Sequence, residues 1–428
     1  MNRLTAICVG CLTLRATLAN AQDAGEASPS GSLLGFLRGQ RVTTLLRMDY
    51  FQSSNSLDGA ENFIGATLQV KALPRITDAL DGKIEWRGSA RDLRDRHGYG
   101  PEGDLLEAYI TAHFGQADLR IGKQIIAWGR ADGINPTDNL TPRDFVVLLP
   151  LEEDQRFGTA AIKLDMYLSQ ELTFTAITSS FFEPDKFSLP TEGVSIQSTQ
   201  PAHTASDAEL AIKLSKTGGV FDWSVSYFDG YSLLPSVAAV ASSTLNLHYD
   251  RTQVLGADAA RNFGRIGFRS EVAYTRPTDP DSTDPNARNA RLFWVAGVDR
   301  TFLENLSVNL QFFLRWMPHY DDPHRLSNPN AQTAAAVNTI IDGQQAQTSY
   351  GMTTRVSKLW FNDTLQAEIF GVVNVVRGDH FVRPLMTYTV SDHVKALLGA
   401  NLYRGARDAQ YGALVPNSGV FAEVRYGL

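Results

Sequence analysis

The chain is almost without cysteine. Of its 428 residues, only Cys8 and Cys11 carry a thiol, and both lie near the N-terminus. Residues 1–21 have the features of a secretory signal peptide, with Arg3, a short apolar stretch and the small-x-small sequence Ala19-Asn20-Ala21. After cleavage no thiol and no disulfide would remain. We therefore expect backbone hydrogen bonds and packing alone to hold the fold together.

The chain also lacks a long apolar segment after residue 21, and it lacks positive net charge. No stretch approaches the ~20 apolar residues that a membrane-spanning helix needs. Removing residues 1–21 removes Arg3, Arg15 and no acid, so 39 basic and 46 acidic residues become 37 and 46. The net charge changes from −7 to −9. This acidity argues against a partner that is a nucleic acid.

What the chain has instead is strict alternation of apolar and polar residues. Between residues 306 and 317, one face carries Leu306, Val308, Leu310, Phe312, Leu314 and Trp316, and the other carries Ser307, Asn309, Gln311 and Arg315. A period of two residues over this length is typical of a tilted strand that crosses a bilayer, which needs about 9–11 residues. The pattern recurs to the C-terminus and predicts about eighteen strands. They are expected near 43–53, 61–74, 82–92, 104–114, 118–128, 156–167, 171–179, 209–216, 220–229, 249–260, 265–275, 290–301, 306–317, 347–360, 365–376, 380–390, 393–403 and 418–428.

The connections between these strands alternate in length. Short turns alternate with mostly longer polar loops, which are expected at 93–103, 129–155, 180–208, 230–248, 276–289, 318–346 and 404–417. Short periplasmic turns and long outer loops are typical of bacterial outer-membrane barrels, in which closed strands satisfy every backbone group. Residues 41–428 are therefore predicted to form an all-β, transmembrane, antiparallel up-and-down barrel of about 18 strands, with 16 as the alternative. Residues 22–40 would be a periplasmic leader, which either plugs the barrel or stays flexible.

The C-terminus supports the same class. Val420, Ala422, Val424, Tyr426 and Leu428 alternate to the last residue, and this resembles the terminal strand that outer-membrane assembly machinery reads. The resemblance implies location in the bacterial outer membrane, with outer-membrane lipid, lipopolysaccharide and the assembly machinery as partners.

Assigning one face of each strand to the lumen predicts the charges along it. The inward basic residues would be Arg47, Lys83, Arg87, Arg91, Arg120, Lys163, Lys213, Arg265, Arg269, Arg291, Arg315, Arg355, Arg383, Lys395 and Arg425. The inward acids would be Asp49, Glu85, Glu107, Asp165, Asp222, Asp258, Glu271, Asp299, Glu368 and Glu423. Fifteen bases against ten acids would focus positive potential and concentrate anions in the lumen. The alternative is that these charges form cross-strand ion pairs that brace the wall.

The most unusual segment runs from Gly122 to Asn139. It contains Gly122-Lys123-Gln124, Trp128-Gly129 and Asn135-Pro136, and Lys123 falls where a lipid-facing residue is expected. This pattern resembles porin-like outer-membrane barrels, including alginate-export-type proteins and poorly characterised relatives. The resemblance covers some twenty residues, and it implies passage or export of small or polymeric, often anionic, solutes.

Residues 129–155 form the third outer loop by this assignment. In porins the third loop folds into the pore, so the resemblance implies a constriction carrying Arg130, Asp132, Asp138, Arg143 and Asp144. The apolar run from Val146 to Leu151 would then pack on the inner wall. The alternative is a loop that caps the outer rim.

A rim enzyme is the competing class of function. His319, Asp321, Asp322 and His324 bring possible general bases or divalent-metal ligands together, and Asp279 and Asp281 add acids. No Gly-x-Ser-x-Gly or His-Glu-x-x-His motif accompanies them. The sequence favours a channel for passive passage of small anionic solutes, without catalysis, cofactor or metal. A barrel with a rim hydrolase or a surface-binding role is the alternative.

Overall fold

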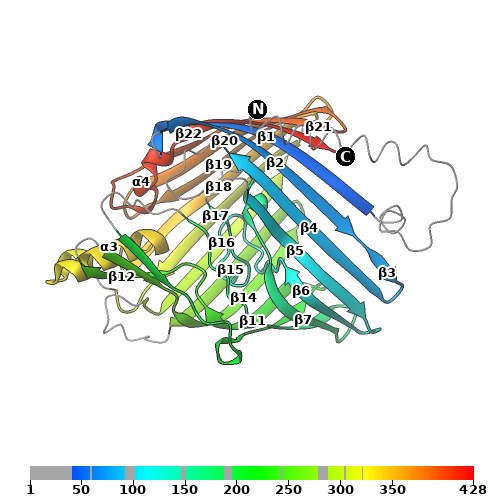
Figure 1. The fold of residues 1–428 in the computed structure, drawn as a ribbon, viewed down its shortest axis with the longest axis horizontal. Helices are drawn as coiled ribbons and strands as arrows, with labels where there is room; N and C mark the ends of the chain where they lie inside the picture. Colours follow the sequence, from blue (N-terminus) through cyan, green and yellow to red (C-terminus); the bar gives the residue numbers. More distant parts are fainter. Residues whose placement is uncertain are drawn as a thin grey trace.

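The computed structural model describes residues 41–57, 60–91, 102–145, 151–187, 195–241, 244–277, 288–302, 305–320 and 322–428. Within these residues, eighteen long antiparallel strands close into one barrel (Figure 1). They are β1 (Arg41–Leu57), β2 (Ala60–Leu73), β4 (Leu80–Arg91), β5 (Glu102–His113), β6 (Ala117–Gln124), β7 (Thr159–Tyr167), β8 (Leu172–Ser179), β10 (Glu209–Lys216), β11 (Asp222–Tyr231), β14 (Arg251–Phe263), β15 (Ile266–Pro277), β16 (Arg291–Thr301), β17 (Leu306–Trp316), β18 (Thr348–Trp360), β19 (Leu365–Asn374), β20 (Asp379–Ser391), β21 (Val394–Arg404) and β22 (Gly419–Gly427). The predicted fold class and strand number are confirmed.

The first and last strands close the barrel. β1 pairs with β22 from Leu45 opposite Gly427 to Ser53 opposite Gly419, and in this register Arg47 lies opposite Arg425. The short strand β3 (Arg75–Thr77) only extends the turn before β4. With every long strand paired on both sides, the backbone donors and acceptors of the wall are satisfied within the sheet, as a lipid environment requires.

Side-chain exposure confirms which face of the strands points inward. On β17, Leu310 is 42% exposed, whereas Gln311 is 3% exposed. The buried charged residues on the strands include Arg47, Arg87, Glu107, Glu271, Arg315, Arg383 and Glu423, all of which were assigned to the lumen. The exposed face is mainly apolar, as expected for contact with lipid.

One predicted strand ends earlier than expected. The alternation suggested a strand over 118–128, but β6 ends at Gln124 and the chain then leaves the wall. Gly122 has φ +131°, and a Cβ there would lie 2.2 Å from the carbonyl oxygen of Ala108. Only glycine accommodates this backbone. The apolar Ile126 and Trp128 therefore belong to the following loop, where they are buried.

Four of the long loops contain strands or α-helices that the sequence did not predict. β9 (Ser195–Thr199), β12 (Ser236–Ala241) and β13 (Thr244–His248) form a separate three-stranded sheet, and α3 (Pro329–Asp342) packs against β12. The Asn328 side chain caps the start of α3, and Gly343 ends it with φ +60°. A short helix, α4 (Gln410–Ala413), lies between β21 and β22. These elements gather at one end of the barrel (Figure 1).

No helix among the described residues is long and apolar enough to span a membrane. The predicted signal peptide and leader, residues 1–40, lie outside the described residues.

The assignment of the two barrel ends gives a direct prediction. An epitope inserted at Asn328, before α3, should be accessible to antibody on intact cells. An epitope at Asn305 or Asn362, in the short turns at the other end, should be accessible only after the outer membrane is opened. Labelling of Asn362 on intact cells would show that the barrel is inserted in the opposite direction. The Asp284 loop was a further expected outer site, but it lies outside the described residues.

Candidate functional site: a loop inside the barrel

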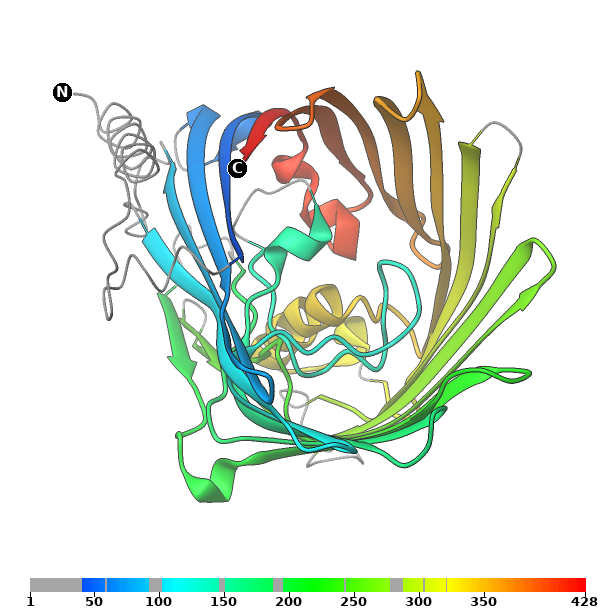
Figure 2. The same cartoon turned by 90° about the vertical axis from the view of Figure 1, so that its right-hand side faces the viewer.

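The segment between β6 and β7 enters the lumen. Viewed along the barrel, its trace crosses the opening between opposite parts of the wall (Figure 2). One part of the segment bonds to β14, β15, β17 and β18, and the other bonds to β1, β4 and β22. A loop that only capped the rim would not reach these inward positions. The structure therefore places the third outer loop inside the barrel.

A single buried carboxylate on β15 holds the first turn of this loop. Glu271 is 1% exposed and accepts hydrogen bonds from the backbone N–H of Arg130 (2.9 Å) and Ala131 (3.2 Å) through Oε2. Its Oε1 accepts from the backbone N–H and the hydroxyl of Thr137, both at 2.8 Å. Gly129 has φ +92°, and a Cβ there would lie 2.6 Å from Oε2. The glycine of the Trp128-Gly129 pair noted in the sequence is thus needed, because a side chain at this position would collide with the Glu271 carboxylate.

A second attachment lies one turn further along the loop, at Asp132. The Gln311 side chain on β17 accepts from the Asp132 N–H (3.0 Å) and donates to the Asp132 carbonyl oxygen (2.6 Å), as a neighbouring strand would. The Asp132 carboxylate pairs with the Arg355 guanidinium of β18 through Nε at 2.8 Å and Nη2 at 3.2 Å. Two-pronged bonds of this kind fix direction as well as distance.

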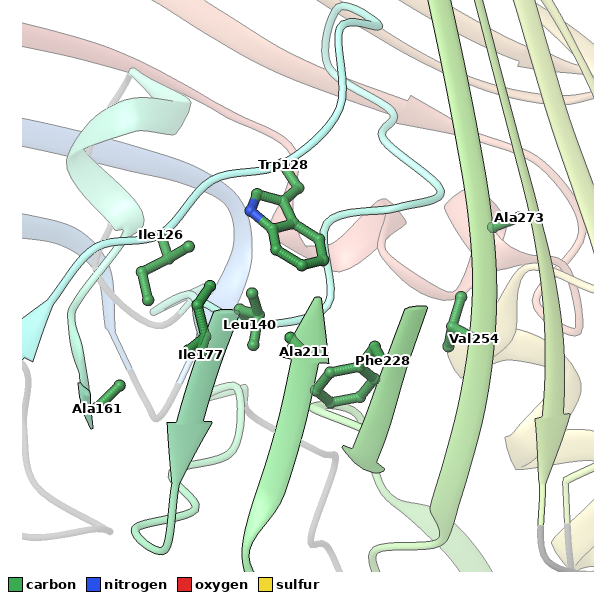
Figure 3. Packing of buried hydrophobic residues seen from close by; sticks show 9 residues of the cluster. All are labelled: Ile126, Trp128, Leu140, Ala161, Ile177, Ala211, Phe228, Val254 and Ala273. Atoms are coloured by element: carbon green, nitrogen blue, oxygen red, sulfur yellow. The ribbon is translucent and has the colours of Figure 1, made fainter. Parts of the chain in front are cut away.

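Apolar packing fixes the flank of the loop. Trp128, Ile126 and Leu140 lie against wall residues that include Ile177, Ala211, Phe228, Val254 and Ala273 (Figure 3). Small and apolar residues on the inner wall leave room for the indole ring. The Lys213 ammonium lies 5.5 Å from the centre of this ring. The burial removes apolar surface from water and favours the docked loop.

The returning part of the loop is attached at the closure of the barrel. Asp154, in the short 3₁₀ helix Glu152–Gln155, pairs with Arg47 of β1 at 2.7 Å and Arg425 of β22 at 3.2 Å. Its carbonyl oxygen accepts from Arg87 of β4 at 2.8 Å. Leu151 packs against the inner-wall cluster Phe51, Phe63, Leu385, Leu397 and Phe421. The predicted packing of the apolar run is confirmed for Leu151, while 146–150 lie outside the described residues.

Between these attachments, the loop contacts the next outer loop. The Asp138 carboxylate pairs with Arg143 at 3.2 Å and Arg156 at 2.5 Å. The Arg143 N–H donates to Asp185 at 2.7 Å, and burial raises the pKa of Asp185 to about 6 despite that hydrogen bond. Asp144 lies 3.8 Å from Arg87 and 3.6 Å from Lys186. Above pH 6 this region therefore gains one negative charge.

The predicted constriction residues are brought together, but in ion pairs. Arg130 pairs with Asp258 at 2.5 Å, just as Asp132 pairs with Arg355 and Arg143 with Asp138. Among the other predicted lining residues, Arg120 donates to Thr111, Arg269 lies 3.4 Å from Asp299, and Arg355 also pairs with Glu368. The side chain of Arg91 lies outside the described residues. These side chains therefore point into the lumen and also form ion pairs or hydrogen bonds that connect the loop and the wall.

Sequence reasoning missed several participants. Glu209 and Asp379, the first residues of β10 and β20, are buried at 7% and 0% exposure, so the inner wall is less basic than predicted. Asp154, Arg156 and Arg288 were missed because nothing in a loop sequence marks the residue that will face a distant strand. Gln311 was assigned inward, but only as a polar wall residue.

Open space remains on both sides of the loop. On the outer side, a cavity of about 280 Å³ is lined by loop residues, by the outer ends of β11, β14 and β15, and by Arg288 and Arg291. We call it the outer vestibule. On the other side, Arg130, Asp222 and Arg269 line a second cavity of about 380 Å³. The loop thus lies between two water-accessible spaces.

The histidine cluster of the sequence is described only in part, because Asp321 lies outside the described residues. No three His, Cys, Asp or Glu side chains converge anywhere in the part of the chain that the structure describes. His319 and His324 border a surface cavity of about 730 Å³ together with Arg377 and Asp408. Asp279, Asp281 and Asp321, the remaining acids of the hydrolase hypothesis, lie outside the described residues.

Comparison with solved structures shows the fold. The chain is similar to Acinetobacter baumannii OccAB3, with 10% identity, TM-score 0.56, and coverage of 91% of this chain and 99% of that one. For Pseudomonas aeruginosa OpdK, solved with vanillate, the identity is 11% and the TM-score 0.56, with coverage of 92% of this chain and 100% of that one. For Pseudomonas aeruginosa OccD3 (OpdP), the identity is 10% and the TM-score 0.54, with coverage of 95% of this chain and 96% of that one. The chain therefore has the fold of bacterial outer-membrane porins.

The comparisons do not show the resemblance to alginate-export barrels. No curated protein matches the sequence. A family model does match, over residues 52–412, which is most of the chain and includes the whole of the loop inside the barrel. The chain belongs to the family described as "Protein of unknown function (DUF1302)".

Proposed function

We propose that this protein is a passive outer-membrane channel for small anionic solutes, narrowed by the loop between β6 and β7. The observation that carries the proposal is the attachment of this loop across the lumen, between β15, β17 and β18 and the β1–β22 closure. A solute that passes through the barrel must move between the loop and the wall. Ion pairs and bidentate hydrogen bonds make this passage a fixed one.

The preference for anions is local. Several arginines of the wall are matched by acids of the loop: Arg47 and Arg425 by Asp154, and Arg355 by Asp132. Among the described residues that line the outer vestibule, three arginines (Arg143, Arg288 and Arg291) stand against two carboxylates (Asp138 and Asp185), and Asp138 also binds Arg156. Surplus positive charge at a mouth of low dielectric raises the local concentration of anions.

The proposal involves no chemistry, cofactor or metal. In support, no group of three His, Cys, Asp or Glu side chains among the described residues is placed to hold a metal ion. Outer-membrane lipid and lipopolysaccharide would contact the exposed apolar band, and assembly machinery would recognise the alternating strand β22.

Ion selectivity tests the proposal. Purified protein in a planar bilayer under a KCl gradient should give open-channel steps with a reversal potential on the anion side. Arg143→Gln should shift this potential toward the cation side, because it leaves Asp138 with one guanidinium. Lys395→Gln, near the periplasmic end of β21, is the matched control and should change it little. Arg425 does not serve as this control, because it binds Asp154 of the loop.

A sealed barrel, or a cation-selective one, would contradict the proposed function. An Arg143→Gln channel as anion-selective as the parent would place selectivity on the arginines of the wall.

A further inference from the structure

A row of basic side chains lies near the end of the barrel that carries the short turns. Its members stand on every second strand of one part of the wall: Lys216 on β10, Arg261 on β14, Arg300 on β16 and Lys358 on β18. Each is among the last three residues of its strand. Because these strands lie side by side (Figure 1), the four residues stand at nearly the same depth. We call them the basic row.

Strand periodicity shows that the basic row faces away from the lumen. Successive side chains of a strand point to opposite faces of the sheet. Arg261 shares the face of Leu255, which is 60% exposed, and Lys358 shares that of Met352, which is 49% exposed. Arg300 is itself exposed. These charges therefore lie on the surface that the membrane surrounds, at its edge.

Aromatic rings lie beneath three members of the row. The distances from charge to ring centre are 5.0 Å for Arg261–Phe221, 4.6 Å for Arg261–Phe263, 4.7 Å for Arg300–Phe302 and 5.4 Å for Lys358–Trp360. The aromatic residues of membrane barrels gather at the membrane–water interface, and long basic side chains extend from there toward the headgroups. The rings therefore support the charges at the level of the lipid headgroups.

Little negative charge compensates the row. Among the residues that the structure describes, no carboxylate forms an ion pair with Arg261 or Arg300. Lys216, at one end of the row, pairs with the exposed Glu171 at 3.4 Å. The whole chain, in contrast, has a net charge of −7. A local excess of positive charge at this depth favours contact with anionic headgroups.

The opposite end of β14 provides a comparison. Arg251 has the same outward parity as Arg261 and lies 5.6 Å from the centre of the Tyr231 ring. Its guanidinium, however, pairs with the Asp229 carboxylate at 2.7 Å. The same strand thus carries an arginine on an aromatic ring at each end, and a carboxylate of the protein neutralises the one at the outer end.

We propose that the basic row binds the phosphate groups of anionic phospholipid in the periplasmic leaflet of the outer membrane. Adjacent strands are about 4.8 Å apart, so successive members of the row are separated by roughly 10 Å. A phosphate between two members is within reach of both long side chains, and a guanidinium binds phosphate oxygens with two parallel hydrogen bonds. The acyl chains then lie along the apolar wall. The inference goes beyond the proposed channel function, because it concerns only the lipid-facing surface.

Native mass spectrometry of the purified full-length protein tests this site, with phosphatidylglycerol and phosphatidylethanolamine added in equal amounts. The parent should retain phosphatidylglycerol in clear preference. Arg300→Gln should lower its retention about fivefold, the effect of one basic residue near an anionic surface. Arg261→Gln combined with Arg300→Gln should abolish the preference. Equal retention of the two lipids by the parent would overturn the proposal.

Arg251→Gln is the matched control, since it removes an outward arginine that Asp229 already neutralises. It should leave lipid retention unchanged, and a loss as large as that of Arg300→Gln would show that the lipid binds elsewhere. Heat-modifiable migration on gels should identify every variant as a folded barrel, which separates loss of the site from damage to the fold.

Lipid A, which carries the phosphates of the outer leaflet, distinguishes the two leaflets. If the parent prefers lipid A to phosphatidylglycerol, and Arg300→Gln removes that preference, periplasmic phospholipid is the wrong partner. Bilayer recordings keep the channel proposal separate. Arg261→Gln combined with Arg300→Gln should leave ion selectivity as in the parent, because neither side chain faces the lumen. A change in selectivity would overturn the outward facing of the row.

Discussion

Glu271→Gln should convert a steady channel into one with about twofold higher mean conductance and frequent fluctuations. Glutamine has nearly the same shape but only one acceptor oxygen, whereas Glu271 accepts four hydrogen bonds from Arg130, Ala131 and Thr137. The NH₂ group of the glutamine would face N–H and O–H donors and could accept no hydrogen bond from them. Hydrogen bonds to a charged group contribute about 1.5–3 kcal/mol each, so their loss weakens the attachment of the loop. The first turn of the loop should therefore detach from the wall. Single-channel recording in planar bilayers measures the result.

The barrel itself should survive this change. No strand pairing involves Glu271's carboxylate, so heat-modifiable migration of the folded barrel on gels should match the parent. Glu85→Gln is the matched control, since Glu85 also points inward but pairs with Lys83 of its own strand. Quiet Glu271→Gln channels of parental conductance would show that Gln311 and Arg355 suffice to hold the loop.

Leu310→Arg should impair assembly in the outer membrane. Leu310 lies in the middle of β17 on the lipid-facing side, where it is 42% exposed. An arginine near the bilayer midplane of a barrel costs roughly 2–4 kcal/mol. The yield of folded, heat-modifiable barrel in outer-membrane fractions, or the free energy of unfolding in urea with lipid vesicles, measures the effect.

The neighbouring inward positions serve as comparison. The sequence suggested that arginine at Gln311 would be tolerated, but Gln311 is 3% exposed and holds Asp132, so arginine there should release the loop. Asn309→Arg, one inward position nearer the turn, is the better control and should assemble normally. Equal yields for Leu310→Arg and Asn309→Arg would contradict the assigned facing of β17.

The wall of the barrel could be predicted because its physics is local. A strand that has lipid on one side and a polar lumen on the other must alternate, and the alternation of Leu306–Trp316 alone assigns each side chain to a face. The same reasoning predicted the turns, since short connections are sufficient between antiparallel neighbours. It failed at β6, which was expected to continue to residue 128 but ends at Gln124, so Ile126 and Trp128 belong to the loop and pack on the inner wall.

The loop inside the barrel could be predicted only as an alternative to a rim cap. Its position depends on partners far away in the chain, such as Arg130 and Glu271, separated by 141 residues. No periodicity encodes such a pairing. Charge composition has the same limit: several arginines of the inner wall are matched by acids that the loop brings, of which Asp154 is the clearest case.

That acid also joins the two ends of the sheet. Arg47 and Arg425 stand directly opposite one another where the first strand meets the last, and like charges in this arrangement repel. Asp154 pairs with both guanidiniums, while Glu423 pairs with Arg425 from the same strand. The loop that narrows the barrel therefore also offsets the charge repulsion at its seam.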